Sequence, residues 1–334
     1  MRNARLAAAT ALLVAALVGG GGCASSPEPP RAVDRPVGVE RYVEGVLAIR
    51  AGQREVAIDR LEAAVAENPE LRMAHSVLGD LYREDGEYRE AVPHYEAVLD
   101  LDPLTLLNYY NLGVTYQMLA RLDDAQQVYA DGLAIDADDV RLNLAMGQAF
   151  LQRGEVDEAL RFLERATRAD PESAAAWSSV GVAHDLQGNY VFAEASYRKA
   201  LELDGDSAGV RQNLAANLLS QGRADDARAL LQDVIADRDT ALARKLLGDA
   251  LRQDGQFAAA EAAYEAALQR EDGFVPALNG LGLALIGQYE DSLQLDEPLR
   301  ERAVALWERS VARKPGQAAV AALIDKWGDD SPLR

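Results

Sequence analysis

Apolar residues recur at helical spacing from residue 38 onward. Leu78 and Tyr82 are four residues apart, and Leu112 and Tyr116 repeat them 34 residues later. Residues three or four apart lie on one face of a helix, so this pattern predicts amphipathic helices. Extended β-branched runs bounded by turn residues, which are typical of strands, are not evident. The chain is therefore predicted to be all-α.

Two ladders of small residues share one period. Gly79 and Gly113 are 34 residues apart, and so are Ala91 and Ala125. The period predicts a repeated pair of antiparallel helices, with the glycine where the two backbones approach most closely. A larger side chain there would overpack the contact, at a cost of about 1–3 kcal/mol. The ladders are Gly45, Gly79, Gly113, Gly147, Gly181, Ala215, Gly248 and Gly282 in the first helices, and Ala57, Ala91, Ala125, Ala159, Ala193, Ala227, Ala260 and Ala303 in the second.

Glycine and proline mark the predicted helix ends. Glycine after a first helix can adopt the left-handed conformation that closes it, and proline after a second helix prevents its continuation. Pro93 conflicts with this order because it falls inside a predicted second helix, which either starts late or bends there. The turn glycines are Gly86, Gly154, Gly188, Gly222 and Gly255, and the terminating residues are Pro69, Pro103, Pro171 and Pro315, or Asp136, Gly205, Asp239 and Asp272.

This 34-residue helix pair resembles the tetratricopeptide repeat family. The resemblance implies an all-α, right-handed superhelical solenoid of about eight helix-turn-helix repeats over residues 38–315. Arg41 and Glu44 replace apolar residues in the first repeat, as a polar capping repeat requires. An insertion at 288–298 is expected to lengthen the turn of the eighth. The repeats are expected near 38–71, 72–105, 106–139, 140–173, 174–207, 208–240, 241–274 and 275–315, followed by a capping helix and tail at 316–334.

The N-terminal residues are typical of an export signal. Basic residues precede an apolar run, Leu6–Val18, that is too short to span a bilayer comfortably, and small residues and Cys23 follow it. Residues 1–22 resemble a bacterial lipoprotein signal peptide, which is cut before a cysteine that carries lipid, although Gly20 stands where such signals usually have Leu. The resemblance implies lipidation of Cys23. It also implies the outer membrane, because the residue after the cysteine is Ala24 and not Asp.

Two other readings of this segment remain open. Cleavage after Ala24 would release a soluble, cysteine-free periplasmic protein, and an uncleaved membrane anchor is the third reading. In each case the proline-rich residues 23–37 are predicted to be an extended tether. About 13 residues at ~3.1 Å each would reach up to ~40 Å.

A solenoid of this type implies an extended concave binding surface lined by the first helices. Polar side chains of mixed charge on the predicted concave face would satisfy the backbone of an extended peptide. The alternative is that they are ordinary solvated helix residues. The candidate groove residues are Arg83, Tyr110, Asn111, Gln117, Arg141, Gln148, Asn213, Asn217, Lys245 and Arg252.

Charge and residue types argue against other functional classes. The 34 basic and 54 acidic residues give a net charge of −20, which repels nucleic acid phosphates. No nucleophile, phosphate-binding or zinc motif is found, so we expect no catalysis, no cofactor, no metal and no small-molecule substrate. His184 takes a packing position filled by tyrosine in sister repeats, and we expect it to be a satisfied core residue. Acidic pairs that begin second helices, such as Asp123-Asp124 and Asp225-Asp226, are explained by the helix dipole.

These observations predict a non-catalytic scaffold that binds a protein or an extended peptide. The leading hypothesis is a lipid-anchored outer-membrane lipoprotein that aids assembly of an envelope complex, similar in layout to the lipoproteins of pilus or secretion systems. The alternatives are a soluble periplasmic adaptor or chaperone, and a regulatory subunit of a cell-wall or polysaccharide enzyme.

Overall fold

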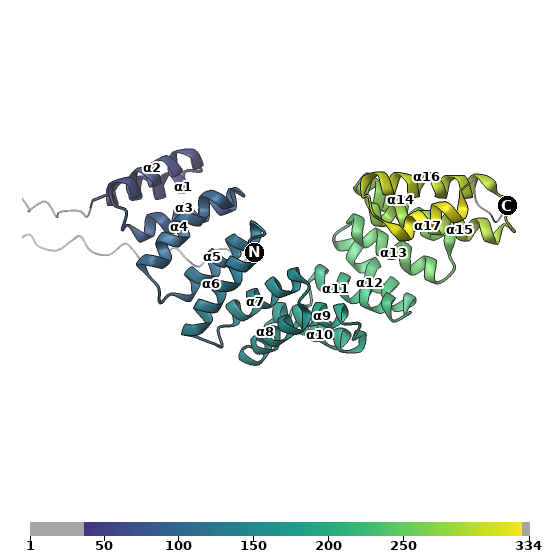
Figure 1. The fold of residues 1–334 in the computed structure, drawn as a ribbon, viewed down its shortest axis with the longest axis horizontal. Helices are drawn as coiled ribbons and strands as arrows, with labels where there is room; N and C mark the ends of the chain where they lie inside the picture. The colour runs from purple at the N-terminus through teal and green to yellow at the C-terminus, as the bar shows by residue number, and fades with distance from the viewer. Residues whose placement is uncertain (1–36, 329–334) are drawn as a thin grey trace, which may run out of the picture.

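The structure is a computed structural model that describes residues 37–328. These residues form seventeen α-helices and no strand, arranged as eight antiparallel pairs and one further helix. Figure 1 shows the pairs following one another along an arc, from α1 at one end to α17 at the other. The predicted all-α solenoid is confirmed. Residues 1–36, with the predicted signal peptide, Cys23 and most of the tether, lie outside the described part of the chain.

The helices alternate along the chain between the two positions of the repeat. The first helices are α1 (Val39–Arg50), α3 (Arg72–Glu84), α5 (Leu106–Met118), α7 (Val140–Arg153), α9 (Ala174–Leu186), α11 (Ala208–Ser220), α13 (Ala241–Gln253) and α15 (Val275–Asp291). The second helices are α2 (Arg54–Glu67), α4 (Tyr88–Leu101), α6 (Leu122–Ile135), α8 (Val156–Ala169), α10 (Tyr190–Leu203), α12 (Ala224–Asp237), α14 (Phe257–Arg270) and α16 (Glu297–Arg313). Helix α17 (Ala318–Trp327) packs against α16.

The alanine ladder lies in the core of every repeat. All eight ladder alanines, from Ala57 to Ala303, have no exposed surface. Large side chains lie beside them, including the fully buried Tyr129 and Trp307. Alanine and leucine also favour helices because they lose little conformational freedom on entering one. Local preference and burial therefore agree along most of the chain, which favours a single fold.

The glycine ladder has a different physical reason from the predicted one. A Cβ atom added to any of these glycines would first contact a side chain of the second helix. A backbone oxygen also comes close only at Gly45 and Gly147. A Cβ atom on Gly79 would lie 2.8 Å from Cε1 of Tyr95, inside van der Waals contact. The glycine therefore makes room for a large residue of its partner helix.

The insertion in the eighth repeat lengthens its helices more than its turn, contrary to the expectation. Helices α15 and α16 have 17 residues each, whereas the other repeat helices have 12 to 14. Buried Ile286 and Tyr289 continue the apolar face of α15, so helix is favoured beyond the usual end. Pro298 lies in the first turn of α16, where proline is tolerated.

Two local details follow from the backbone. Helix α4 begins at Tyr88, in step with α6 at Leu122, so Pro93 does not delay its start. Pro93 is exposed, which places the carbonyl that loses its helix partner on the solvent side. The turn glycines have positive φ as predicted, and Ala120 adopts φ 56° in the turn of the third repeat, where sister repeats have glycine.

The first repeat is less polar at its outer end than a cap was expected to be. Arg41 and Glu44 do form ion pairs there. Leu47, however, is 55% exposed, although the equivalent residues of the next repeats, such as Leu81 and Ala149, are buried by the preceding helix pair. No helix within residues 37–328 combines the length and apolar character needed to cross a bilayer.

Candidate partner-binding surface

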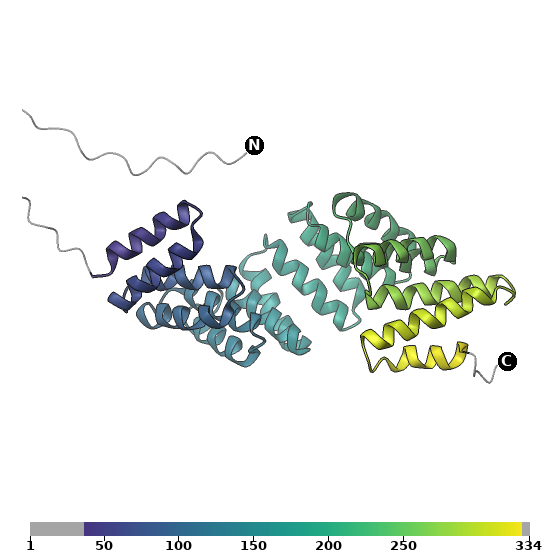
Figure 2. The same cartoon turned by 90° about the horizontal axis from the view of Figure 1, so that it is seen from above.

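The first helices form the inner side of the arc. Figure 1 shows α5, α7 and α9 on that side and α6, α8 and α10 outside them. Consecutive first helices also contact one another from α5 to α15, as expected where the radius is smaller. Figure 2 shows the same order of helix pairs from above. The predicted groove residues lie on these inner helices.

A tyrosine ladder supports this inner face from behind. In four repeats the second-helix residue that packs against the ladder glycine is tyrosine. Its hydroxyl donates a hydrogen bond to a polar residue of the first helix. The pairs are Tyr95 with Asp80 at 2.6 Å, Tyr129 with Gln117 at 2.5 Å, Tyr197 with Asp185 at 2.8 Å and Tyr264 with Asp249 at 2.6 Å. The other repeats have leucine or tryptophan at that position (Leu61, Leu163, Leu231 and Trp307). Each bond holds one polar side chain of the first helix in a defined position.

The ladder hydroxyls remain donors at neutral pH. Burial raises the pKa of Tyr95, Tyr197 and Tyr264, and the adjacent carboxylate raises it further. Burial also raises the pKa of Tyr129, whose hydrogen-bond partner is a neutral amide. A protonated phenol beside a carboxylate makes a charge-assisted hydrogen bond, which is stronger than a neutral one.

Two repeats carry the same charged arrangement on the inner face. In repeat 2, Nε of Arg83 donates to the hydroxyl of Tyr95 at 3.0 Å, while that hydroxyl donates to Asp80. Repeat 7 has the equivalent residues Asp249, Arg252 and Tyr264, and Nζ of Lys245 lies 2.7 Å from Asp249. Nε of Arg252 is buried without a hydrogen-bond partner in the described structure. The inner face thus has a charged cluster toward each of its ends.

The predicted groove residues differ in how far they reach solvent. Arg141 and Gln148 are exposed on α7, and Gln148 donates to Ser179 of the next repeat at 3.4 Å. Tyr110 packs against the core of the first repeats. The half-buried members are Arg83, Tyr110, Asn111, Gln117, Asn213, Lys245 and Arg252.

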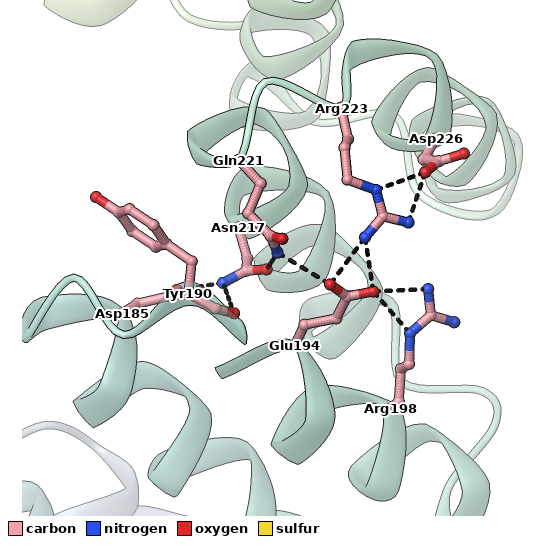
Figure 3. Close-up of polar contacts among 8 residues, drawn as sticks. All are labelled: Asp185, Tyr190, Glu194, Arg198, Asn217, Gln221, Arg223 and Asp226. Carbon is pink, nitrogen blue, oxygen red and sulfur yellow. Dashed lines mark hydrogen bonds and ion pairs between the residues drawn. The ribbon is translucent and has the colours of Figure 1, made fainter. Parts of the chain in front are cut away.

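Asn217 is not available to a partner, contrary to the expectation. It is 1% exposed, and its Nδ2 donates to Oδ1 of Asp185 at 2.5 Å and to the carbonyl of Tyr190 at 3.0 Å. Gln221 donates to its Oδ1 at 2.7 Å. Asn217 therefore joins repeat 6 to repeat 5 across the α9–α10 turn (Figure 3).

A second contact extends the same junction. Figure 3 shows that Glu194 of α10 accepts hydrogen bonds from Gln221 and Arg223 of repeat 6 and from Arg198 of its own helix. Burial alone would raise the pKa of Glu194, but these three hydrogen-bond donors outweigh burial and hold the pKa below its ordinary value. The carboxylate is charged at neutral pH, and all its contacts are made within the chain.

Two of the three histidines meet in repeat 2, which the sequence did not predict. Nδ1 of His75 lies 3.0 Å from Nδ1 of His94, and Nε2 of His75 lies 3.0 Å from the carbonyl oxygen of Pro69. Because that carbonyl only accepts, Nε2 of neutral His75 carries its proton, and Nδ1 of His94 is the donor of the pair. His184 is only half-buried, and its Nδ1 has no partner among the described residues, so it is not the satisfied core residue expected.

The histidine pair makes stability depend on pH. Burial, and then His75, lower the pKa of His94, while Glu62 of α2 opposes the shift. In the unfolded chain the pKa of His94 is about 6.5, so the unfolded state takes up a proton before the folded state does as the pH falls. The contribution of His94 to the free energy of unfolding is fully present above about pH 6.5. It is lost as the pH falls toward the lower pKa of His94 in the folded state.

We expect urea unfolding to show lower stability at pH 5.5 than at pH 7.5, and His94→Phe to reduce that difference. If the difference is unchanged in His94→Phe, other groups cause the pH dependence.

Among the described residues, no group of three or more histidine, cysteine, aspartate or glutamate side chains is arranged to hold a metal ion.

The tyrosine hydroxyls are the inner-face feature that sequence reasoning missed. They were interpreted as packing residues only, yet a signal was present. In each of the four repeats the tyrosine follows the ladder glycine by 16 residues, as Tyr95 follows Gly79. Where alanine replaces the glycine, at position 215, the partner is the smaller Leu231.

A family model described as the cilia and flagella-associated protein 70 C-terminal domain, a tetratricopeptide repeat domain, matches residues 7–277. The chain belongs to the tetratricopeptide repeat family. The repeat geometry above and the match agree over most of the described helices.

Other relatives and solved structures support the fold. The chain is 29% identical over 170 residues to cellulose synthase 1 operon protein C of Komagataeibacter xylinus, covering 48% of this chain and 11% of that protein. A tetratricopeptide repeat protein of Parabacteroides merdae has a TM-score of 0.55 at 18% identity, covering 86% and 97% of the two chains. PilF of Pseudomonas aeruginosa has a TM-score of 0.54 at 20% identity, covering 62% and 94%.

The matched region is a small part of many relatives. The chain spans about a fifth of the length of two of the curated relatives it matches. The structural similarities, at these identities, support the solenoid fold and not a particular partner. Together the findings describe a scaffold-type repeat protein.

Proposed function

We propose that the chain is a non-catalytic scaffold that binds an extended segment of a partner protein along its inner face. The observation that carries this proposal is the tyrosine ladder, which holds polar side chains of the first helices in place in repeats 2, 3, 5 and 7. Pre-positioned side chains reduce the entropy cost of binding. Arg141 and Gln148 add exposed groups between them that can bond a peptide backbone.

We propose further that the scaffold is exported and anchored to the outer membrane by lipid on Cys23, and that it aids assembly of an envelope complex. The sequence pattern around Cys23 supports this proposal, and the structural similarity to PilF is compatible with it. Labelling cells with radioactive palmitate tests the anchor. Label is expected on the wild-type chain and not on Cys23→Ser. Label that persists without Cys23 would contradict lipidation of that cysteine, whereas a wild-type chain without label would favour the soluble periplasmic form.

Photo-crosslinking in cells tests the binding face. A photoreactive residue is placed in turn at Gln148 on the inner helix α7 and at Arg161 on α8, whose side chain is 73% exposed. The inner-face position is expected to form an adduct of defined mass, and the control at Arg161 to form none. Adducts of the same mass from Arg161 alone would place the partner on the outer face and contradict the proposal.

A second candidate function is a regulatory subunit of a polysaccharide enzyme. The similarity to cellulose synthase 1 operon protein C favours it. It uses the same inner face, so the mass of the adduct at Gln148 distinguishes the two candidates. A polysaccharide synthase in the adduct would select the second, and a structural envelope protein the first.

A further inference from the structure

The α9–α10 turn carries an exposed apolar patch that the proposed function does not use. Leu186 is 59% exposed, Val191 72% and Phe192 65%, and Tyr190 lies beside them at 36%. The ring of Phe192 lies 5.6 Å from that of His184, so this side chain covers the end of α9. These four residues, Leu186, Tyr190, Val191 and Phe192, are called the repeat-5 patch below.

The repeat-5 patch departs from the repeat pattern. Positions 191 and 192 begin a second helix, and the same positions hold acidic pairs in three neighbouring repeats: Asp123-Asp124, Asp157-Glu158 and Asp225-Asp226. Acids in a first turn are favoured by the helix dipole, and α10 has none there. Leu186 likewise replaces Gln152 and Ser220 of the flanking repeats. Repeat 5 thus lacks a stabilising feature and exposes apolar surface in its place.

The junction with repeat 6 binds the chain on both sides of the patch. Asn217 bonds Asp185 just before the α9–α10 turn and the carbonyl of Tyr190 just after it. Glu194, one helical turn further, is held by Gln221 and Arg223. Figure 3 shows the ring of Tyr190 pointing away from this polar network. Because the backbone around the patch is held, ordering this segment adds little to the entropy cost of binding a partner.

The surroundings of the patch are acidic. Gln187, in the turn itself, donates to Asp157 of repeat 4 at 2.6 Å, which places a carboxylate beside the patch. On the other side, the side chain of Asp225 is 79% exposed and forms an ion pair with Arg228. The whole chain has a net charge of −20. An apolar surface between acidic ones complements a segment whose apolar residues are flanked by lysine or arginine.

We infer that the repeat-5 patch is a second docking site, on the edge of the solenoid, for an amphipathic basic helix of a partner protein. Two or three apolar side chains of that helix pack on Val191 and Phe192. Its lysine or arginine residues face Asp157 of repeat 4, whose partner is the neutral Gln187, and the exposed Asp225 of repeat 6. The site is separate from the inner face, so an extended segment and a helix can bind together.

Defined peptides test this inference with the purified full chain. The probe is a fluorescent 18-residue helical peptide with leucine and phenylalanine on one face and lysine on the other. One matched peptide has glutamate in place of lysine, and another has serine in place of the apolar residues. Anisotropy is expected to show at least tenfold tighter binding of the basic apolar peptide than of either match, and salt is expected to weaken it.

The variant Val191→Asp with Phe192→Glu removes the patch by installing the acidic pair of the sister repeats. Because first-turn acids suit the helix dipole, this variant is expected to melt no lower than wild type by circular dichroism. Its affinity for the basic apolar peptide is expected to fall at least tenfold. Val56→Glu is the control, since Val56 is exposed at the same position of repeat 1, outside the patch, and affinity should be unchanged.

Several results would overturn the inference. Equal affinity of wild type and the double variant for the peptide would show that the peptide binds at another site. Equal binding of the glutamate peptide would remove the charge argument. A dimer in sedimentation that the double variant dissociates would identify a second copy as the occupant. Loss of binding to phosphatidylcholine vesicles in the same variant, without a change in peptide affinity, would identify a lipid surface.

Discussion

Gly113→Ala is expected to lower the free energy of unfolding by about 1–2 kcal/mol. The added methyl group would overlap the ring of Tyr129, which has no exposed surface and is held by its bond to Gln117. Overpacking costs about 1–3 kcal/mol or more, and the better helix propensity of alanine returns about 1 kcal/mol. Urea unfolding followed by circular dichroism measures the loss.

A double-mutant cycle shows whether the tyrosine is the cause. Repeat 6 pairs Ala215 with Leu231, so Gly113→Ala with Tyr129→Leu copies an arrangement that the chain already contains. The double variant is expected to be at least about 1 kcal/mol more stable than the sum of the single losses predicts. Additive losses would contradict the size match. Gly209→Ala is the control, because no atom lies within 4 Å of its added methyl group, and it should not destabilise.

Asn217→Ala is expected to cost about 2–3 kcal/mol, although alanine stands at the equivalent positions 149, 183 and 250. Alanine fits the space, so the loss comes from the hydrogen bonds of the asparagine side chain, one of them to a carboxylate. The lost bonds are those of Nδ2 to Oδ1 of Asp185, whose other oxygen keeps the Tyr197 hydroxyl, and to the carbonyl of Tyr190. Hydrogen exchange should rise first in α9–α12, on both sides of the junction.

Asn213→Ala is the matched control for this junction. Asn213 lies one helical turn earlier on α11, is half-buried, and takes part in none of the hydrogen bonds described for the chain. Its loss should change stability by less than about 0.5 kcal/mol. Equal effects of the two variants would show that the asparagine network does not hold repeats 5 and 6 together.

The repeat pattern carried much of the fold, and its failures are local. The apolar spacing and the small-residue ladders predicted a solenoid of helix pairs, because both depend on contacts within one repeat and its neighbour. The insertion in the eighth repeat was assigned to the turn alone, since the count of inserted residues does not say whether they extend the helices or the loop. Helix is favoured because Ile286 and Tyr289 are buried when α15 continues past its usual end.

The candidate binding surface was predicted less completely. The sequence placed most of the inner-face residues on first helices but could not separate exposed Gln148 from buried Asn217, because both are polar residues on a first helix. The difference depends on which neighbouring repeat lies over each residue. The pairing of His75 with His94 is of the same kind, since nineteen residues separate them along the chain.

The sequence by itself determined the helix pairs, their period and the small residues that let them pack, since these follow from spacing and side-chain volume along the chain. Only the tertiary structure decided where the hydroxyls of the tyrosine ladder bond, which polar residues join repeats, and that the repeat-5 patch has no cover. The reason is that hydrogen bonding and burial depend on atoms from separate helices, whose approach the order of residues does not state.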